Sequence, residues 1–229
     1  MSKRNYDGYL ITLEGPEGSG KTTVWKETST WLTAKHGIHP LCPREPGGHP
    51  LSEKIGDLLR DISNTGMSDS TEMFMFQACR AELTDKVLIP ALKEGRLIFL
   101  DRFADSSVVY QGVARGLGVD MINYMNKIST KGLKPDLTIL MDLPIDLGLE
   151  RKSRQGVMER IDSELIAFHR LVREAYLKLY ETNEDGRWEI VDASKNLGEV
   201  VESVQNIVET RLTRSGFIER PNISTERRG

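Results

Sequence analysis

Three observations predict that this chain folds as an α/β domain with three layers and a parallel sheet. Short apolar runs recur along the sequence, amphipathic helical patterns separate them, and the length of 229 residues fits one domain at roughly 100–200 residues per domain. Near-continuous apolar runs are typical of parallel strands that helices cover on both faces. The alternation of strands with helices implies right-handed crossover connections.

The expected strands are four short apolar runs, three of which end in an acidic residue. They are residues 9–14 (YLITLE), 97–101 (LIFLD), 137–142 (LTILMD) and 188–193 (WEIVDA). A fifth and weaker candidate is residues 39–42, which precede a loop rich in proline and glycine. These runs are short enough for strands and too short for most helices.

Helical patterns fill the intervals between these runs. In residues 164–180 and 197–212, apolar residues recur every three or four positions, which is the spacing of one helix face. Residues 71–94 also have a helical pattern until Pro90, which interrupts it because proline lacks an N–H. Residues 213–229 contain four Arg, two Glu and few apolar side chains. We therefore expect one working domain at residues 1–212, followed by a mobile tail at 213–229.

Composition and charge exclude several classes of protein. The chain has 31 basic and 34 acidic residues, whereas a protein that binds nucleic acid usually has a basic excess. Its two cysteines, Cys42 and Cys79, are too few for a disulfide scaffold or a zinc site, so we expect reduced thiols. The sequence has no apolar run of 18 residues, and its N-terminus lacks the apolar core of a signal peptide. We therefore expect a cytoplasmic protein that binds neither nucleic acid nor a membrane.

Residues 15–22, GPEGSGKT, match the pattern G-x-x-x-x-G-K-[ST] of a phosphate-binding loop. The glycines let the backbone turn tightly, so that successive N–H groups point at phosphate oxygens. Lys21 is expected to contact the β- and γ-phosphates, and the Thr22 hydroxyl is expected to bind Mg²⁺. The helix that follows presents its positive N-terminal end to the anion. The expected nucleotide-binding residues are Gly15, Pro16, Glu17, Gly18, Ser19, Gly20, Lys21, Thr22 and Thr23.

This loop alone does not separate kinases from GTPases or motor ATPases. A GTPase needs an N-K-x-D motif that binds guanine and a D-x-x-G switch. The segment Asn126-Lys127-Ile128-Ser129 ends in serine where that motif has a carboxylate, and no D-x-x-G occurs in the sequence. The sequence therefore disfavours a GTPase.

Several arginines lie where a kinase would bind a small phosphorylated acceptor. Such an enzyme brings two sets of phosphates together, so it needs cations besides the loop lysine. Arg44 and Arg102 each follow an expected strand, and ligands of α/β proteins bind beyond the carboxyl ends of parallel strands. Asp101 ends one of these strands, in the position that holds Mg²⁺ in enzymes with this loop. A further cluster around Gly156 consists of Arg151, Arg154 and Arg160.

Together these motifs resemble those of bacterial thymidylate kinases, over about residues 9–212. The resemblance rests on GPEGSGKTT at 15–23, REPGG at 44–48, Phe76 with Arg80 one helical turn later, DRFADSSVVYQG at 101–112, KPDLT at 134–138 and ERID at 159–162. It implies the P-loop nucleoside-monophosphate-kinase fold, with a five-stranded parallel sheet and a short mobile lid at about residues 150–162. It also implies a homodimer that transfers the γ-phosphoryl group of Mg-ATP to dTMP, on the dTTP synthesis pathway.

The resemblance implies roles for the residues that match the family around the base and the sugar. Phe76 would stack on thymine, a contact that its flat apolar ring supports. Arg80 would donate a hydrogen bond to a base carbonyl. Ser107 and Gln111 would bind the polar edge of the pyrimidine, and Tyr110 would crowd the 2′ side of the sugar and so favour deoxyribose.

The resemblance also implies roles around the phosphates. Arg44 and Arg102 would hold the acceptor phosphate, and Ser106 is expected among the substrate-binding residues. Glu17 would meet the sugar 3′-hydroxyl or order water near the transferred group. The expected catalytic residues are Lys21, Arg102, Glu17 and one arginine of the lid, for which Arg160 fits its motif best and Arg154 is the alternative.

One position departs from the family pattern. The helix after REPGG usually bears an arginine that faces the acceptor site, but this sequence has Gly56 there and Arg60 one turn later. Either Arg60 reaches back, or that contact is missing.

Two other functions remain open from the sequence. One is a kinase for a different nucleoside monophosphate. The other, more distant, is an ATPase or binding module with the same phosphate-binding loop and no phosphoryl acceptor.

Overall fold

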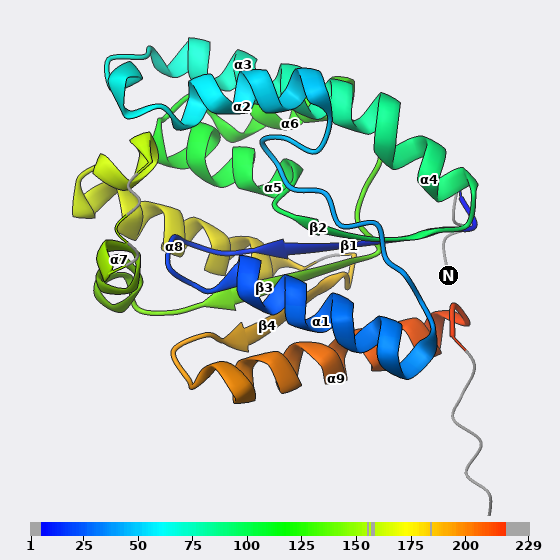
Figure 1. Ribbon diagram of the computed structural model, residues 1–229. Coiled ribbons are helices and arrows are strands. Elements are labelled where there is room, and N and C mark those ends of the chain that lie inside the picture. The colour runs from blue at the N-terminus through cyan, green and yellow to red at the C-terminus, as the bar shows by residue number, and fades with distance from the viewer. Residues whose placement is uncertain (1–5, 155, 157–158, 184, 219–229) are drawn as a thin grey trace, which may run out of the picture.

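The computed structural model describes residues 6–154, 156, 159–183 and 185–218 (Figure 1). At its centre is a four-stranded parallel sheet with the strand order β2-β1-β3-β4. The strands are β1 (Tyr9–Glu14), β2 (Leu97–Asp101), β3 (Leu137–Asp142) and β4 (Trp188–Asp192). All four of the stronger apolar runs are therefore strands, and the α/β class with a parallel sheet is confirmed.

Helices cover both faces of this sheet, because successive side chains of a strand point to opposite faces. On one face, Ile11 of β1 packs in a buried cluster with residues of α1 (Lys21–His36) and α9 (Leu197–Ser215). On the other face, Leu10 packs in a second buried cluster with Leu88 and Leu92. Figure 1 shows α1 and α9 below the sheet and α2, α3, α5 and α6 above it.

The remaining helices lie mostly on the second face. They are α2 (Pro50–Arg60), α3 (Asp69–Leu83), α4 (Ile89–Lys93), α5 (Ala104–Ser107), α6 (Val119–Ser129), α7 (Ile145–Arg154) and α8 (Ile166–Thr182). Single turns of tighter or wider helix are η1 (Ile62–Asn64), η2 (Thr84–Leu88), η3 (Val108–Ala114) and η4 (Arg160–Ser163). Among the described residues, no helix combines the length and the apolarity that crossing a membrane requires.

The expected five-stranded sheet is wrong, because residues 39–42 form only one isolated bridge to β2, between Leu41 and Ile98, and a second isolated bridge joins Arg44 to Asp101. Leu41 N donates to Leu97 O at 2.8 Å, and Phe99 N donates to Leu41 O at 2.9 Å. The next donor in this register would be residue 43, but Pro43 has no N–H. Phe99 O accepts a hydrogen bond from the Trp25 indole instead. The proline therefore breaks the ladder, although the segment still lies beside β2.

The helical stretch around Pro90 is also more continuous than expected. After α3 the chain passes through η2, a wide π-helical turn, and directly into α4. Leu88 and Ile89 are already helical, and Pro90 follows this wide turn at the start of α4. The proline therefore coincides with a change from a wide turn to α-helix and does not end the helical segment.

The C-terminal helix continues beyond residue 212, where we expected the tail to begin. α9 ends at Ser215, and Gly216 caps it in the left-handed conformation. Phe217 packs against Tyr9, with ring centroids 5.8 Å apart. The rest of the predicted tail, from residue 219 on, lies outside the described residues, as do residues 155, 157 and 158 of the predicted lid.

Candidate active site

A cleft of about 290 Å³ opens beyond the carboxyl ends of β1 and β2. Its walls come from segments that are far apart in the sequence: the loop between β1 and α1, the residues after β2, parts of α2 and α3, and the region of η4. This is the position at which open parallel sheets bind their ligands.

The loop between β1 and α1 needs glycine at two positions. Gly15 has a φ of 143°, and a Cβ placed there would lie 2.5 Å from Met141 O. Gly18 also has a positive φ, and a Cβ there would collide with the backbone of Gly148 in α7. The loop therefore packs its backbone directly against the end of β3 and against α7, in a shape that side chains would prevent.

Lys21, the first residue of α1, turns back across this loop. Its Nζ donates hydrogen bonds to Gly15 O at 2.9 Å, Pro16 O at 2.8 Å and Ser19 Oγ at 3.0 Å. Burial, together with the nearby positive charge of Arg102, lowers the pKa of Lys21 to about 7. A bound anion would restore the charged form, so the lysine is held ready for a negatively charged ligand.

Thr22 and Asp101 meet at the mouth of the loop. Thr22 Oγ1 donates to Asp101 Oδ2 at 3.1 Å, and the buried Asp101 Oδ1 has no hydrogen-bond partner among the described residues. A hydroxyl beside a carboxylate oxygen without a partner fits a hydrated Mg²⁺, which binds few protein ligands and retains water. Within the described part of the chain, no group of three or more His, Cys, Asp or Glu side chains could hold a metal ion.

Arg102 connects the end of β2 to the phosphate-binding loop. Its Nη2 donates to Glu17 Oε1 at 3.0 Å, and its Nη1 donates to Tyr176 OH at 3.2 Å and Ser106 Oγ at 3.3 Å. Tyr110 OH also donates to Glu17 Oε1, at 2.6 Å. Arg102 and Glu17 are therefore held in fixed positions on the floor of the cleft.

Glu17 is ionised in this environment. Burial alone would raise the pKa of Glu17, but the contact with His169 and the charges of Arg102 and Lys21 outweigh burial and hold that pKa well below its ordinary value. His169 is itself buried, and its Nδ1 lies 3.5 Å from Glu17 Oε2. The carboxylate can therefore accept hydrogen bonds from a ligand at any pH near neutrality.

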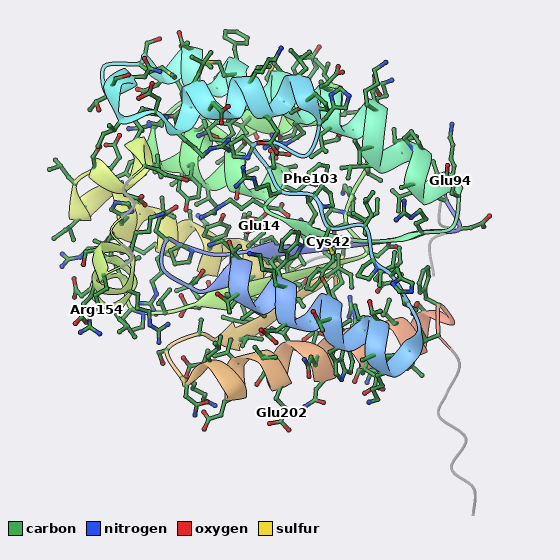
Figure 2. All side chains as sticks on the ribbon, viewed as in Figure 1. Glu14, Cys42, Glu94, Phe103, Arg154 and Glu202 are labelled. Carbon is green, nitrogen blue, oxygen red and sulfur yellow. The ribbon has the colours of Figure 1, made fainter. Side chains whose placement is uncertain are left out.

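Glu14 lies behind Arg102, and the sequence did not predict it as a site residue. Phe103 N donates to Glu14 Oε1 at 2.8 Å, while Ser106 Oγ and Tyr176 OH donate to Oε2 at 2.6 and 2.9 Å (Figure 2). Burial and the charge of Asp105 raise the pKa of Glu14 to about 7. The group therefore titrates near neutral pH and sits among the hydroxyls that position Arg102.

The other wall of the cleft carries the residues expected around a base. Phe76 of α3, Ser107 of α5 and Tyr110 and Gln111 of η3 all line it. Gln111 Nε2 donates to Glu72 Oε1 at 2.8 Å. Because this bond fixes the amide nitrogen, the Gln111 carbonyl oxygen is left to accept from a ligand.

Arg80 is placed behind this wall and does not line the cleft. It is fully buried, forms an ion pair with Glu45, and donates to Ser107 Oγ at 2.9 Å and Asn126 Oδ1 at 2.7 Å. Among the cleft-lining side chains expected around a base, Arg80 contacts Ser107 directly, and it does not itself face the cleft. Its contact with Ser107 instead positions a side chain that does face the cleft.

The two lid arginines are placed very differently. Arg160 of η4 is buried at the cleft, where it donates to Glu72 Oε2 at 2.6 Å and to Leu59 O at 3.0 Å. Arg154 is 75% exposed, pairs only with Glu150 on its own helix among the described residues, and does not line the cleft. Figure 2 shows it on the outer side of α7. Of the two expected candidates, the structure brings only Arg160 to the site.

Most of the predicted site residues therefore come together. Those that line the cleft are Glu17, Gly18, Ser19, Gly20, Lys21, Thr22, Thr23, Arg44, Phe76, Asp101, Arg102, Ser106, Ser107, Tyr110, Gln111 and Arg160. Gly15 and Pro16 belong to the loop and contact Lys21 without lining the cleft, and Arg80 and Arg154 lie outside it.

Several cleft residues were missed by the sequence reasoning. They include Glu45, Lys152 and Asp162, whereas Arg60, one of the two alternatives left open at the position of Gly56, does line the cleft. Lys152 Nζ lies 3.2 Å from Asp162 Oδ2, which joins α7 to η4 beside the cleft. The signal for Lys152 was its place in the basic cluster around Gly156, but spacing alone does not tell which member of such a cluster points inward.

Comparisons with known proteins identify the family of this chain. The family model described as thymidylate kinase matches residues 13–204. The thymidylate kinase of Latilactobacillus sakei subsp. sakei is 40% identical over 203 residues, which cover 88% of this chain and 94% of that protein. The chain belongs to the thymidylate kinase family. The thymidylate kinase of Geotalea daltonii is 43% identical over 212 residues, which cover 90% of this chain and 98% of that protein.

The architecture is shared with this family as well. A crystal structure of thymidylate kinase from Ehrlichia chaffeensis matches with a TM-score of 0.71 at 26% identity, and the match covers 88% of this chain and 98% of that one. The resemblance predicted from the motifs is therefore confirmed for nearly the whole chain, and the protein is a phosphotransferase of the thymidylate kinase family.

Proposed function

We propose that this protein transfers the γ-phosphoryl group of ATP to dTMP, giving ADP and dTDP, in the cytoplasm and on the dTTP synthesis pathway. The observation that carries the proposal is the cleft itself, in which a phosphate-binding loop faces a wall with Phe76 and Gln111. Family membership supports the same reaction.

On the donor side, the loop from Gly15 to Thr23 binds the phosphates of ATP. Its N–H groups and the N-terminus of α1 supply partial positive charge, and Lys21 supplies a full one. Thr22 and Asp101 would hold Mg²⁺, which neutralises charge on the phosphate oxygens when it is bound.

On the acceptor side, Phe76 stacks on thymine and Gln111 accepts from the N3–H of the base. This assignment follows from the bond between Gln111 and Glu72, which leaves the Gln111 oxygen free to accept. Ser107 binds the same polar edge, in an orientation that Arg80 supports. Tyr110 crowds the 2′ side of the sugar, while the ionised Glu17 accepts from the 3′-hydroxyl.

The reaction is a direct in-line transfer without a covalent enzyme intermediate. Phosphoryl transfer depends mainly on positioning and on neutralising charge, and the phosphate of dTMP is already a good nucleophile. Arg44 and Arg102 hold that phosphate, and Lys21 and Arg160 stabilise the charge on the transferred group. We assign Arg160, not Arg154, to this role because it is the one beside the cleft.

A panel of acceptors tests the proposal. With ATP, the purified enzyme should phosphorylate dTMP with a higher kcat/KM than dUMP, UMP or AMP in an assay coupled to ADP formation. If the enzyme prefers another monophosphate, that monophosphate is the acceptor and the assignment of dTMP is wrong. ADP formation that does not depend on any monophosphate would support the ATPase alternative and overturn the proposal.

We also propose that the protein is a homodimer that associates through α2, α3 and α6. Large apolar side chains are exposed on these three helices. Figure 1 shows the three helices together above the sheet. Such side chains are Leu51, Leu58, Phe74, Met121, Tyr124 and Ile128. Apolar side chains gathered on one surface are typical of an interface, and a dimer with twofold symmetry buries the same surface on both subunits.

Replacing one of these side chains by a charge tests the dimer. Phe74 is 58% exposed, so Phe74→Glu should leave the fold intact and convert the dimer to a monomer. Sedimentation equilibrium at several protein concentrations measures the change. A wild-type protein that sediments as a monomer would contradict the proposal.

A further inference from the structure

Arg60 and Gly56 lie on one face of α2, a single helical turn apart. Gly56 is buried, and a Cβ placed on it would lie 2.9 Å from Arg60 Nη1 and 3.1 Å from Arg60 Nη2. The guanidinium group of Arg60 therefore occupies the space that any side chain at position 56 would need. Glycine at position 56 therefore leaves room for Arg60 to reach back toward the start of α2.

The position of Arg60 is held by groups of the neighbouring loop and helix. Its Nη1 donates to Pro46 O at 2.7 Å, and its Nη2 donates to Asp57 Oδ1 at 2.8 Å. The side chain is only 18% exposed although it ends the helix, and it lines the cleft. In the described part of the chain, Arg60 Nε donates to no protein atom, so the guanidinium retains a donor for a ligand.

Glu53 links Arg60 to a second arginine of the cleft. Glu53 Oε2 lies 3.2 Å from Arg44 Nη2 and 3.5 Å from Arg60 Nη2. Glu53 Oε1 in turn accepts from Gly48 N at 2.8 Å, which fixes the carboxylate on the loop. One anchored carboxylate therefore positions two guanidinium groups on the same side of the cleft.

We propose that Arg60 binds the phosphate of the monophosphate acceptor together with Arg44, and that Gly56 is required because it leaves room for Arg60. The proposal rests on the proposed function, since it assigns an additional binding residue to the same acceptor site. Two guanidinium groups suit a dianionic phosphate because each presents several N–H donors in a plane. Asp57 is largely exposed and Glu53 half-exposed, so both acids can yield a hydrogen bond when phosphate binds.

Binding of dTMP and of thymidine separates a phosphate contact from a structural role. Arg60→Met should weaken dTMP binding about tenfold or more, because it removes charge-assisted hydrogen bonds to the phosphate. Thymidine lacks the phosphate, so Arg60→Met should change the dissociation constant of thymidine less than about twofold. Gly56→Ala should weaken dTMP binding in the same selective way, since the methyl group displaces the guanidinium.

The double variant Gly56→Ala with Arg60→Met tests whether the two residues act as one unit. It should bind dTMP no more weakly than Arg60→Met alone, because the methyl group then has nothing to displace. Arg60→Lys should recover part of the affinity for dTMP. The matched control is Lys54→Met, which removes an exposed cation from the same helix outside the cleft and should bind both ligands normally. Isothermal titration calorimetry measures all constants.

Three results would overturn the role of Arg60. They are unchanged dTMP binding by Arg60→Met, equal weakening for dTMP and thymidine, and additive effects of the two substitutions. These results are distinct from a failure of the proposed function, which would be seen as a wild-type enzyme that does not phosphorylate dTMP. A wild-type enzyme that is active on dTMP, with an Arg60→Met variant that binds it normally, would overturn only this inference.

Discussion

Arg102 is held in an uncommon backbone conformation at the centre of the site. Its φ is 66°, in the left-handed region that non-glycine residues rarely occupy, and such a conformation costs of order 1–3 kcal/mol. Its N–H donates to Leu13 O at 3.0 Å, and its side chain reaches Glu17 and Tyr176. These bonds offset the strain and direct the guanidinium toward the phosphate-binding loop instead of along the strand.

Removing the Lys21 ammonium should abolish catalysis and leave the fold intact. Lys21→Ala should reduce kcat by about a thousandfold or more, since residues that neutralise the transferred group contribute factors of this size. The buried ammonium contributes little to stability, because burial lowers the pKa of Lys21. Steady-state kinetics and urea unfolding measure the two effects, and Lys26→Ala, an exposed lysine on α1, is the control. Unchanged turnover in Lys21→Ala would contradict the proposed role.

Truncation of Phe76 should affect one substrate much more than the other. Stacking of an aromatic ring on a base is worth roughly 1–3 kcal/mol, so Phe76→Ala should raise the KM for dTMP by about tenfold or more. The KM for ATP should change little, because Phe76 belongs to α3 and not to the phosphate-binding loop. If the KM values for dTMP and ATP rise equally, Phe76 does not bind the base.

Residues within motifs were predictable from the sequence, whereas their distant partners were not. Lys21, Thr22 and Asp101 follow from local spacing and from their place at strand ends. Glu14 was visible only as the last residue of an apolar run, and its partner Tyr176 is 162 positions away. A single sequence carries no signal for such a pairing, because it depends on how α8 packs against β1.

At the scale of elements, a buried ion pair holds η4 against α3. Glu72, in the first turn of α3, is 1% exposed, and Arg160 is 3% exposed. Hydrogen bonds from Arg115 and Gln111 also help to keep the pKa of Glu72 below its ordinary value, against the effect of burial. The turn that carries a cleft arginine is therefore anchored by a carboxylate of a distant helix.

Loss of this anchor should release η4. Glu72→Ala leaves the buried Arg160 without a carboxylate, and breaking a buried ion pair on one side costs about 3–5 kcal/mol. Amide hydrogen exchange in residues 160–163 should become at least about tenfold faster, because opening of this segment then costs less free energy. Asp69→Ala, which removes a half-exposed acid from the same helix, is the control and should leave exchange unchanged.

The elements themselves were largely predictable, and the exceptions have local physical causes. The four stronger strands follow from their apolar runs. Residues 39–42 have a similar pattern, but Pro43 removes the next ladder donor. Pro90 was expected to interrupt a helix, yet the segment stays helical because a wide turn directly precedes the proline. The same residue type therefore interrupted one element and was accommodated in another.

At the scale of the whole molecule, the order of the strands could not be derived from the sequence. The sheet has the order β2-β1-β3-β4, so β1 lies in the middle, although it comes first in the chain. This order depends on which side of β1 each crossover returns. It has a functional consequence, because it brings the ends of β1 and β2 side by side and so places Asp101 next to Thr22.

The buried Glu14 should make the stability of the molecule depend on pH. Its folded pKa is raised from 4.5 to about 7, so between these values the folded state binds more protons than the unfolded state. The free energy of unfolding should therefore fall as the pH rises from about 4.5 to about 7. One pKa unit corresponds to about 1.36 kcal/mol, so Glu14 alone should lower the free energy of unfolding by roughly 3 kcal/mol over this pH range.

A comparison of variants isolates this contribution. Glu14→Gln should lose the fall in stability, so that the difference in unfolding free energy between wild type and variant changes by roughly 3 kcal/mol across this range. Urea unfolding at pH 5 and pH 8 measures it. Glu94→Gln, an exposed glutamate at the far end of the molecule in Figure 2, is the control and should retain the wild-type dependence. If the stability of Glu14→Gln depends on pH in the same way as that of the wild type, other groups cause the dependence.

Residues 39–44, which lie beside β2 without forming a strand, also have a consequence for solubility. They form one border of the sheet, and the exposed border of a sheet can recruit a strand from another chain. Backbone groups of residues 41, 43 and 45 face β2, so those of the intervening residues face the outer side. Pro40 is one of these outer residues and has no N–H, so it removes a donor that an intermolecular ladder would need and acts against aggregation of the folded enzyme.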